Sequence, residues 1–476
     1  MISEIINLYK ENKLKEANFL CEKLILEKKL NFDELLIICN VKIKIKDFLS
    51  AIKLAQDAIN LQPNNYIGYN DLAIALKSLG NYDLAIKNYE KALKINPKVF
   101  QVYNNLGLLY KKINKFNNAV LNFKNCLNLN PNYSEAHTNL ATVFNEKKFY
   151  KLAKFHFNTA INLNPKDFLS HWNLSLLLLK VGKFNEGWHY YEYGKKCGMR
   201  PNPEFKYGKL WDGIKNLNKK KILIYSEQGL GDTIQFCRYI KLIKSLGCEV
   251  IFQTYENLKY LLKDIDGIDK IICKKEEVEQ IDYYCSLLSL PILLSKNNLN
   301  IINVVPYISI PNDNLKNWEE RLNFGELKIG ICCNAKKTDQ NFRSFNISCL
   351  KKISKLKNLK LISLEKNSNY KKTFANILEI GDLDNIIPFR DTAAIISKLD
   401  LIITCDTVIA HLAGALNKKT LLLLNYKSDW RWGVRKNTTL WYPSLQLFRN
   451  KKQNNWKESF EKIFNYLKIN YNVNYK

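Results

Sequence analysis

Proline recurs at a fixed interval in the first part of the chain. The four prolines lie 34 residues apart, at Pro63, Pro97, Pro131 and Pro165. Alanine recurs at the same interval, at a position that precedes each proline, as Ala51, Ala85, Ala119 and Ala153. A unit of this length, with small residues where two helices cross and proline after the second helix, is typical of stacked helix pairs. The interval therefore predicts an all-helical region in which each unit packs on its neighbours.

The pattern resembles the tetratricopeptide repeat. A third set of equivalent positions holds leucine, at Leu72, Leu106, Leu140 and Leu174. The resemblance covers residues 1–196, with a partial unit at 1–31 and a diverged last unit at 168–196. It implies a right-handed superhelix with a concave groove that binds segments of other proteins.

One repeat position carries amide side chains. Asparagine occupies it in three units and aspartate in the unit before, giving Asp71, Asn105, Asn139 and Asn173. The arrangement resembles O-linked N-acetylglucosamine transferases, which implies that these residues line a groove for an acceptor peptide. An amide both donates and accepts hydrogen bonds, so it can pair with a peptide backbone of any sequence. The alternative is that asparagine is simply common at this position of the repeat.

The second half of the chain alternates between short apolar segments and amphipathic ones, after a linker or docking segment at 197–217 that is rich in proline and glycine. The first series of predicted strands is 221–225, 249–254 and 268–272, with an edge element at 282–291. The second series comprises a strand at 328–335, a helix at 347–356, a strand at 359–364, a strand with its following loop at 385–391, and a helix capped by Asp391 and Thr392. This alternation predicts parallel sheets in two doubly wound lobes, residues 218–316 and 317–476.

The segment LIITCDTVIAHLAGAL at 401–416 reads as a buried strand, a polar turn and a small-residue helix. Asp406, Thr407 and His411 then lie at the carboxyl end of the strand, beside the free N–H groups of the first helical turn. That position binds anions in doubly wound folds. His411 has a second interpretation, as a histidine that is satisfied within the core.

Polar side chains also lie in two loops that follow predicted strands. Lys336 and Arg343, in the loop after the strand at 328–335, can bind a diphosphate or remain solvated. In the first lobe, Asp232 follows a loop with Gly229 and Gly231, but Ile234 replaces the third glycine of a dinucleotide fingerprint. Asp232 can cap the following helix, or it can face the crevice as a general base.

Three motifs resemble the heptosyltransferase-like family of glycosyltransferases, which have the GT-B fold. The motifs are GLGDTIQFCRYI at 229–240, the stretch from 391 to 416, and SDWRWG followed by WYPSLQLFR. The resemblance implies that Asp232 is the base for the acceptor hydroxyl and that Asp406, Thr407 and His411 hold the nucleotide diphosphate. Val408 departs from the family, which often has glycine there. No metal or other cofactor is implied, and the aspartate pairs at 264/266 and 382/384 are expected to lie in loops.

Together the two halves predict a metal-independent glycosyltransferase that uses a nucleotide-sugar donor and a protein acceptor held by the repeats. Two alternatives remain open. One is a non-catalytic scaffold for protein–protein interaction. The other is a transferase that acts on lipopolysaccharide-type glycans.

Composition adds limits on partners and location. The formal net charge is +28, which reflects either a lysine-rich genome or attraction to an anionic partner. No basic stripe interleaved with aromatics occurs, so no nucleic acid is expected. The 12 cysteines form no metal-type pairs, which favours free thiols in a reducing compartment. Without a signal peptide or an apolar run of about 18 residues, we expect a cytoplasmic protein with no transmembrane segment.

Overall fold

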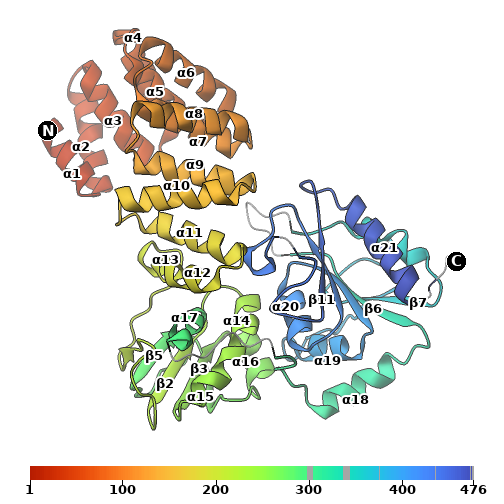
Figure 1. Ribbon diagram of the computed structural model, residues 1–476. Coiled ribbons are helices and arrows are strands. Elements are labelled where there is room, and N and C mark those ends of the chain that lie inside the picture. The colour runs from red at the N-terminus through yellow and green to blue at the C-terminus, as the bar shows by residue number, and fades with distance from the viewer. Residues whose placement is uncertain (297–303, 336–342, 375, 435, 472, 474–476) are drawn as a thin grey trace. The chain divides into compact units, whose positions relative to one another are not determined.

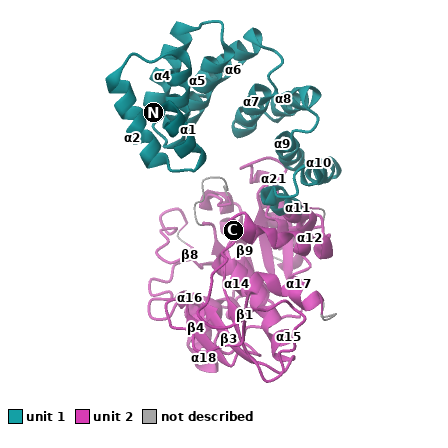
Figure 2. Ribbon diagram, turned by 90° about the vertical axis from the view of Figure 1, so that its left-hand side faces the viewer, with its two compact units in different colours: residues 1–174 teal, residues 175–476 magenta. Residues whose placement is uncertain are grey.

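The computed structural model describes residues 1–296, 304–335, 343–374, 376–434, 436–471 and 473 (Figure 1). By its internal contacts the chain divides into two compact units, Met1–Leu174 and Ser175–Lys476 (Figure 2). Among the helices of the described residues, none combines the length and the apolar character that crossing a membrane requires.

Unit 1 is built from consecutive helix pairs, which confirms the all-helical repeat region. Its helices are α1 (Ile2–Lys10), α2 (Leu14–Glu27), α3 (Phe32–Lys44), α4 (Phe48–Leu61), α5 (Tyr66–Ser78), α6 (Tyr82–Ile95), α7 (Phe100–Lys112), α8 (Phe116–Leu129), α9 (Ser134–Glu146), α10 (Tyr150–Leu163) and the first part of α11 (Phe168–Lys180). Each periodic proline follows the end of a second helix. In Figure 2, α7 and α9 lie along the inner side of the curved stack, and α8 and α10 lie along its outer side.

The periodic small residues explain why these helices pack closely. Ala85, Ala119 and Ala153 are completely buried, and each lies on the second helix of its pair. On a first helix, Gly107 lies so close to Phe123 that an added Cβ would be 2.6 Å from the ring. Because interiors are close-packed, larger side chains at these positions would push the helices apart.

Unit 2 contains two parallel sheets. The first has the strand order β1–β5–β2–β3–β4. Its strands are β1 (Lys209–Leu210), β2 (Lys221–Tyr225), β3 (Glu249–Thr254), β4 (Lys270–Cys273) and β5 (Tyr283–Ser286). The expectation of an edge element at 282–291 is wrong, because β5 lies inside the sheet between β2 and β1. The edge strand is β1, which comes from the segment before the first lobe.

The second sheet has the order β11–β10–β9–β6–β7–β8, with every pair parallel. Its strands are β6 (Leu327–Cys332), β7 (Leu359–Ser363), β8 (Ile377–Leu378), β9 (Leu401–Cys405), β10 (Thr420–Leu424) and β11 (Leu445–Arg449). Numbered along the chain within this sheet, the order is 3-2-1-4-5-6, in which the winding direction reverses between β6 and β9. Such an open parallel sheet binds ligands beyond the carboxyl ends of the strands at this reversal.

Helices cover both sheets. They are α12 (Phe184–Tyr191), α13 (Tyr193–Lys196), α14 (Leu230–Phe236), α15 (Ile240–Lys244), α16 (Glu256–Leu262), α17 (Leu290–Ser295), α18 (Asn312–Arg321), α19 (Arg390–Lys398), α20 (Val408–Ala415) and α21 (Lys457–Tyr471). β9 and β10 are buried along their whole length, as strands of a sheet covered on both faces are.

Several local predictions in the second lobe are wrong. The segment 347–356 forms two 3₁₀ turns rather than an α-helix, and 385–391 contains no strand. The helix expected to be capped by Asp391 and Thr392 begins at Arg390 instead. The carboxylate of Asp384 caps it, accepting the backbone N–H groups of Asp391 at 2.8 Å and Thr392 at 3.1 Å. Asp384 satisfies the free N–H groups of the first turn from outside the helix.

Candidate functional site

The reversal point of the second sheet opens onto the start of α20. Asp406 and Thr407 follow β9 directly, and Thr407 is the N-cap of α20. The Thr407 hydroxyl accepts the backbone N–H of Ile409 at 3.2 Å. The free N–H groups of a first helical turn therefore lie at the edge where ligands bind in doubly wound sheets. This geometry agrees with the strand–turn–helix predicted at 401–416.

Asp406 is a buried carboxyl group at this edge. Only 7% of the residue is exposed. Burial, and then the neighbouring charge of Asp429, raise its pKa to about 6, while Arg343 acts in the opposite direction. A carboxyl group with this pKa exchanges its proton near neutral pH, which is a property common in functional sites.

His411 lies one turn further along α20 and is packed on several sides. Its ring stacks on Trp432 with the centroids 5.1 Å apart, and its Nδ1 is 3.1 Å from the Tyr442 hydroxyl. Burial, and then the charge of Arg431, lower its pKa to about 3. His411 is therefore neutral, and any anion near it would meet an N–H dipole rather than a positive charge.

The glycine loop of the first lobe lies against this helix. A Cβ added to Gly231 would be 2.6 Å from Cδ2 of His411. Helix α14, which contains Gly231 and Asp232, packs directly on α20. The structure thus brings Asp232 from the first lobe and the Asp406–His411 segment from the second lobe to one junction within unit 2.

Asp232 makes two contacts at this junction. One carboxylate oxygen accepts the Gly229 N–H at 2.8 Å, which caps the start of α14 from the third position of the helix. The other oxygen accepts a hydrogen bond from the guanidinium of Arg431. Burial raises the pKa of Asp232, although Arg431 partly opposes this shift. Asp232 therefore caps α14, and it also contacts the second lobe through Arg431.

Arg431 links the two lobes, and the sequence did not single it out. Besides Asp232, its guanidinium binds Asp429 at 2.8 Å and lies over the Trp430 ring at 4.4 Å. Among the described residues, its buried Nε has no hydrogen-bond partner. Arg431 belongs to the motif SDWRWG, which the sequence does show. Its pairing with Asp232 could not be read from a local pattern, because the two residues are 199 positions apart.

A second arginine holds the lobes together. Arg238, just after α14, donates to the Trp441 carbonyl at 2.8 Å and to the Tyr307 hydroxyl at 3.0 Å. Its guanidinium also lies over the Tyr442 ring at 4.8 Å. Because Tyr442 contacts His411, this arrangement fixes the environment of the histidine. No pattern in the sequence pointed to Arg238.

The cations predicted near a diphosphate are only partly described. The side chain of Arg343 is half-buried and acts electrostatically on Asp406 and His411. Its Nε is buried and has no hydrogen-bond partner within the described part of the chain. Lys336 lies outside the described residues.

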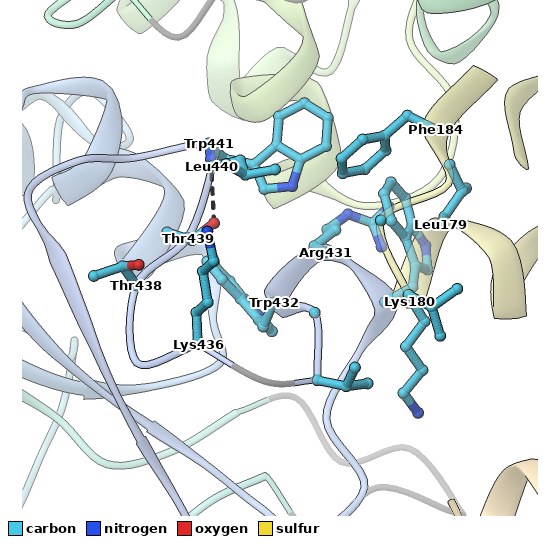
Figure 3. A pocket seen from close by; sticks show the side chains of 15 residues that line it. Leu179, Lys180, Phe184, Arg431, Trp432, Lys436, Thr438, Thr439, Leu440 and Trp441 are labelled. Carbon is cyan, nitrogen blue, oxygen red and sulfur yellow. Dashed lines mark hydrogen bonds between the residues drawn. The ribbon is translucent and has the colours of Figure 1, made fainter. Parts of the chain in front are cut away.

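A cavity of about 210 Å³ lies beside Arg431 (Figure 3). Its walls come from the α11–α12 turn and from the loop between Trp430 and Trp441, and they include Phe184 and Trp432. The cavity is smaller than the pockets that take drug-sized ligands. Trp430 and Trp441 are 6% and 1% exposed, so these rings serve mainly as packing.

The predicted groove residues of unit 1 bond to one another across repeats. Asn105 donates its amide to Asn70 at 3.1 Å, and Asn139 donates to Asn104 at 3.0 Å. Each acceptor lies one residue before the ladder position of the preceding repeat.

The two outer ladder positions differ from these. Asp71 accepts hydrogen bonds from Asn40 at 3.2 Å and Asn70 at 3.0 Å. Asn173 is half-buried on α11. The ladder therefore joins neighbouring repeats, a role that the sequence did not indicate.

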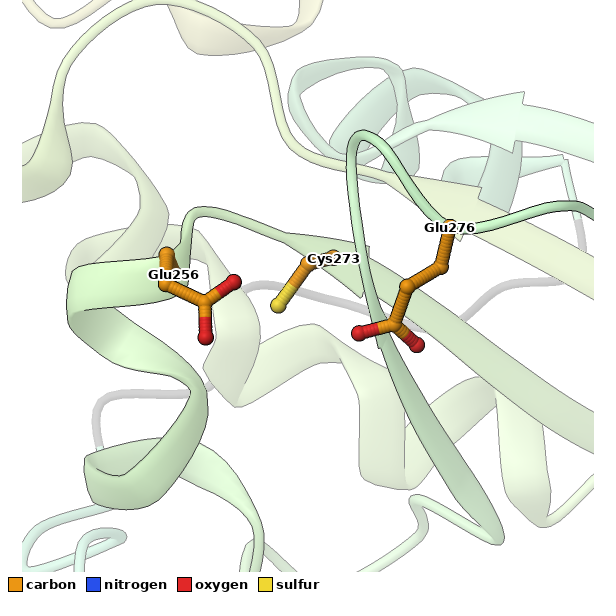
Figure 4. A group of neighbouring side chains, drawn as sticks. All are labelled: Glu256, Cys273 and Glu276. Atoms are coloured by element: carbon orange, nitrogen blue, oxygen red, sulfur yellow. The ribbon is translucent and has the colours of Figure 1, made fainter.

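One group of possible metal ligands occurs among the described residues, away from the motifs above. Glu256 and Glu276 lie on either side of Cys273 (Figure 4). Lys259 binds Glu276 at 2.7 Å. Burial, and then Glu256, raise the pKa of the Cys273 thiol to about 12. Because Glu276 is paired with Lys259 and both glutamates are exposed, we assign no metal to this group.

The aspartate pairs at 264/266 and 382/384 do not form a further group of this kind. Asp266 binds Lys241 at 2.6 Å, Asp382 binds Arg321 at 3.2 Å, and Asp384 caps α19.

Comparison with known proteins identifies the repeats. Models described as tetratricopeptide repeat match residues 54–87 and 100–133, and a model described as TPR repeat matches 75–114. The N-terminal region therefore contains tetratricopeptide repeats. Protein FlbA of Caulobacter vibrioides is 33% identical over 75 residues, which is 15% of this chain and 12% of that protein.

Solved structures match part of this chain. A thermophilic TPR protein of Thermus thermophilus is 20% identical with a TM-score of 0.35, covering 37% of this chain and 97% of its own. Pseudomonas aeruginosa PilF is 19% identical with a TM-score of 0.34, covering 36% of this chain and 78% of its own.

Proposed function

We propose that unit 2 is a GT-B glycosyltransferase that moves a sugar from a nucleotide-activated donor to a hydroxyl group, and that the repeats bind the protein carrying this hydroxyl. Tetratricopeptide repeats are protein-binding modules, which supports the second part. The observation that carries the first part is the junction of the two lobes. There a carboxylate, Asp232, and a helix N-terminus that suits a diphosphate, at Thr407, belong to opposite lobes.

The reaction balances with the groups at this junction. The bond between the sugar C1 and the diphosphate oxygen breaks, and the acceptor oxygen forms a new bond to C1. The acceptor proton passes to Asp232, and the nucleoside diphosphate leaves with the electron pair. Backbone N–H groups at the start of α20, with Arg343, offset the negative charge that grows on the leaving group. Burial raises the pKa of Asp232 above its ordinary value, which makes its carboxylate a stronger base.

Arg431 has a defined part in this proposal. Without substrate it holds Asp232 in an ion pair, and a carboxylate held in this way is a weaker base. A bound diphosphate competes for the guanidinium, which frees Asp232 for the acceptor. His411 adds an N–H donor if its Nδ1 accepts from Tyr442, because the proton then resides on Nε2.

The test is the substitution Asp232→Asn, assayed with a panel of nucleotide-sugars and with nucleoside diphosphates by calorimetry. Sugar-nucleotide turnover should fall by about 100-fold or more, because general base catalysis contributes roughly 100- to 10,000-fold. Nucleoside diphosphate binding should stay within a few-fold of the wild type. A variant that turns over at the wild-type rate would show that Asp232 is not the base.

A non-catalytic scaffold is the second candidate. It is favoured by the close packing of His411 and by the ion pair that occupies Asp232. Wild-type protein that binds no nucleoside diphosphate in the same calorimetry would support it. Transfer to a lipopolysaccharide-type glycan, with no transfer to protein, would keep the enzyme and change its acceptor.

A further inference from the structure

Two of the five histidines in the chain contact each other within one repeat of unit 1. His137 on α9 and His156 on α10 place their Nδ1 atoms 2.9 Å apart. The two ring centroids are 5.2 Å apart, and the ring planes are inclined by 31°. The pair therefore joins the two helices of a single repeat through nitrogen atoms that face each other.

The other ring nitrogen of His137 has a fixed partner. Its Nε2 lies 3.0 Å from the carbonyl oxygen of Pro131. Because a carbonyl oxygen can only accept a hydrogen bond, Nε2 carries the proton of the neutral ring and Nδ1 presents a lone pair to His156. A histidine that donates one ring N–H to a backbone carbonyl and directs the other nitrogen at a neighbour has the arrangement of a metal ligand.

His156 is also held in place, and it is neutral. Its ring stacks on Phe144 with the centroids 5.6 Å apart, and it meets the Phe155 ring edge-on at 5.1 Å. Burial, and then the charges of His137 and Lys124, lower the pKa of His156 to about 4. At neutral pH a metal ion therefore does not have to displace an added proton from this ring.

The fold of a repeat does not require this pair of imidazoles. In the two preceding units the position of His137 holds tyrosine, and the position of His156 holds asparagine. These residues are, in chain order, Tyr69, Asn88, Tyr103 and Asn122. The histidines are therefore a feature of one repeat and not of the helix pair as such.

The next repeat has one half of the arrangement. His171 lies 34 residues after His137, and its Nε2 is 3.0 Å from the Pro165 carbonyl oxygen. The residue 34 positions after His156 is Tyr190. The carbonyl contact of His171 thus occurs without a second histidine at the equivalent position, which makes His171 a matched control.

The separation of the two nitrogens favours some metal ions over others. With metal–nitrogen bonds of about 2.0–2.1 Å, a separation of 2.9 Å places the two nitrogens about 90° apart around an ion. Neighbouring ligands have this angle in the square-planar and tetragonal sites that Cu²⁺ and Ni²⁺ prefer. A tetrahedral Zn²⁺ site requires about 3.3–3.4 Å between the nitrogens.

We propose that His137 and His156 form a binding site for a divalent transition-metal ion of the Cu²⁺ and Ni²⁺ type, which bridges α9 and α10 through the two Nδ1 atoms. Without the ion, His156 donates its Nδ1–H to Nδ1 of His137. When the ion binds, this proton moves to Nε2 of His156, so both lone pairs coordinate the metal and no proton is released. The proposal depends neither on the transferase nor on partner binding by the repeats.

Water completes the coordination of the ion. Among the described residues, no third histidine, cysteine or carboxylate forms a ligand group with this pair. His156 is half-buried, which leaves one side of the pair toward solvent.

One nearby charge opposes the ion. Lys124 on α8 acts electrostatically on His156, and its ammonium group repels a divalent cation. Because Lys124 is exposed, solvent weakens this repulsion. The substitution Lys124→Gln should therefore tighten metal binding by roughly two- to threefold.

The experiment measures Ni²⁺ binding to the full chain by calorimetry, with chelator-treated protein that carries no polyhistidine tag. Ni²⁺ is the probe because Cu²⁺ can oxidise the free cysteines. The variants His137→Tyr and His156→Asn each introduce the residue that the two preceding repeats carry at that position. His171→Tyr is the control, since it removes a histidine from the next repeat. Thermal unfolding without metal verifies that each variant is folded.

The wild type should bind Ni²⁺ at least about tenfold more tightly than His137→Tyr and His156→Asn, since even the groups that orient a ligand contribute 10- to 100-fold to metal affinity. His171→Tyr should bind as the wild type does. Ni²⁺ should also raise the unfolding temperature of the wild type and of His171→Tyr, but not that of His156→Asn. No binding by the wild type at about 1 mM Ni²⁺, wild-type affinity in His156→Asn, or an equal loss in His171→Tyr would each overturn the proposal.

Discussion

Asp71 is the one acidic member of a ladder that otherwise holds asparagine. It is 3% exposed, and its neighbours Asn40 and Asn70 are neutral donors. Burial raises its pKa from 3.8 to about 6. The ionised form is therefore disfavoured in the folded repeat. The stability that the protonated form of Asp71 contributes is fully present below about pH 4. This contribution is lost as the pH rises through about 6.

The substitution Asp71→Asn should stabilise the protein at pH 8. The pKa shift corresponds to a penalty of up to about 3 kcal/mol on the charged form. Asparagine offers one carbonyl oxygen instead of two, so one donor loses its partner and the net gain should be about 1–2 kcal/mol. Calorimetric unfolding at pH 8 and at pH 4 measures it, and the gain should shrink at the lower pH.

The reverse substitution, Asn105→Asp, is the control. Asn105 holds the same position in the next repeat and donates its amide to Asn70. A carboxylate there has no donor hydrogen for this bond, so stability at pH 8 should fall. Equal and small effects of both substitutions would show that ionisation at this position is unimportant.

At the scale of elements, the packing of α14 on α20 is what joins the two lobes at the candidate site. Gly231 is in the first turn of α14, where alanine would ordinarily favour the helix. A Cβ added to Gly231 would however clash with the His411 ring, and Trp432 and Tyr442 pack against the same ring. The close approach of the two helices therefore requires glycine.

We expect Gly231→Ala to destabilise unit 2 by about 1–3 kcal/mol, the usual cost of overpacking. Thermal unfolding followed by tryptophan fluorescence measures this loss, since Trp432 stacks on His411. Gly325→Ala is the matched control, because a Cβ there meets no atom within 4 Å. It should change stability by less than about 0.5 kcal/mol. Similar behaviour of the two variants would contradict the tight α14–α20 contact.

The elements also show what a sequence can and cannot predict. The repeats were predictable because 34-residue spacing repeats the same local packing several times. β2 and β3 were predictable to the residue from their apolar runs. The inner place of β5 was not, because strand order depends on pairing with β1, far away in the chain. The cap of α19 was missed because Asp384 bonds across a turn in which Phe389 has a left-handed φ of 60°.

At the scale of the whole molecule, the candidate site was predictable in its parts. Asp232 and Asp406 were each identified at a strand–helix junction, and the resemblance assigned them to one reaction. The ion pair between Asp232 and Arg431 was not predictable, since it joins Asp232 to a loop of the other lobe. Likewise the sequence suggested a peptide groove at the asparagines, and it did not show that the amides of Asn105 and Asn139 already bind the preceding repeat.

The proposed donor site makes a prediction that spans the whole chain. A nucleoside diphosphate that binds at the lobe junction should slow amide hydrogen exchange in 401–416 and 229–240. The N–H groups that start α20 would bind phosphate oxygens, and the ligand would favour the closed contact of α14 on α20. At about 100 times its Kd, a ligand stabilises the state it binds by about 2.7 kcal/mol, so exchange that requires opening of this site should slow about 100-fold.

The repeats supply the internal control for this measurement. Peptides from 54–133, where the tetratricopeptide repeat models match, should exchange at an unchanged rate with the nucleotide. If a nucleotide instead slowed amide exchange in the repeats, the anion-binding site would have to lie outside unit 2. Absence of protection by every nucleoside diphosphate tested would leave Asp406 and Arg431 as structural groups, and the chain would then act through its repeats as a scaffold.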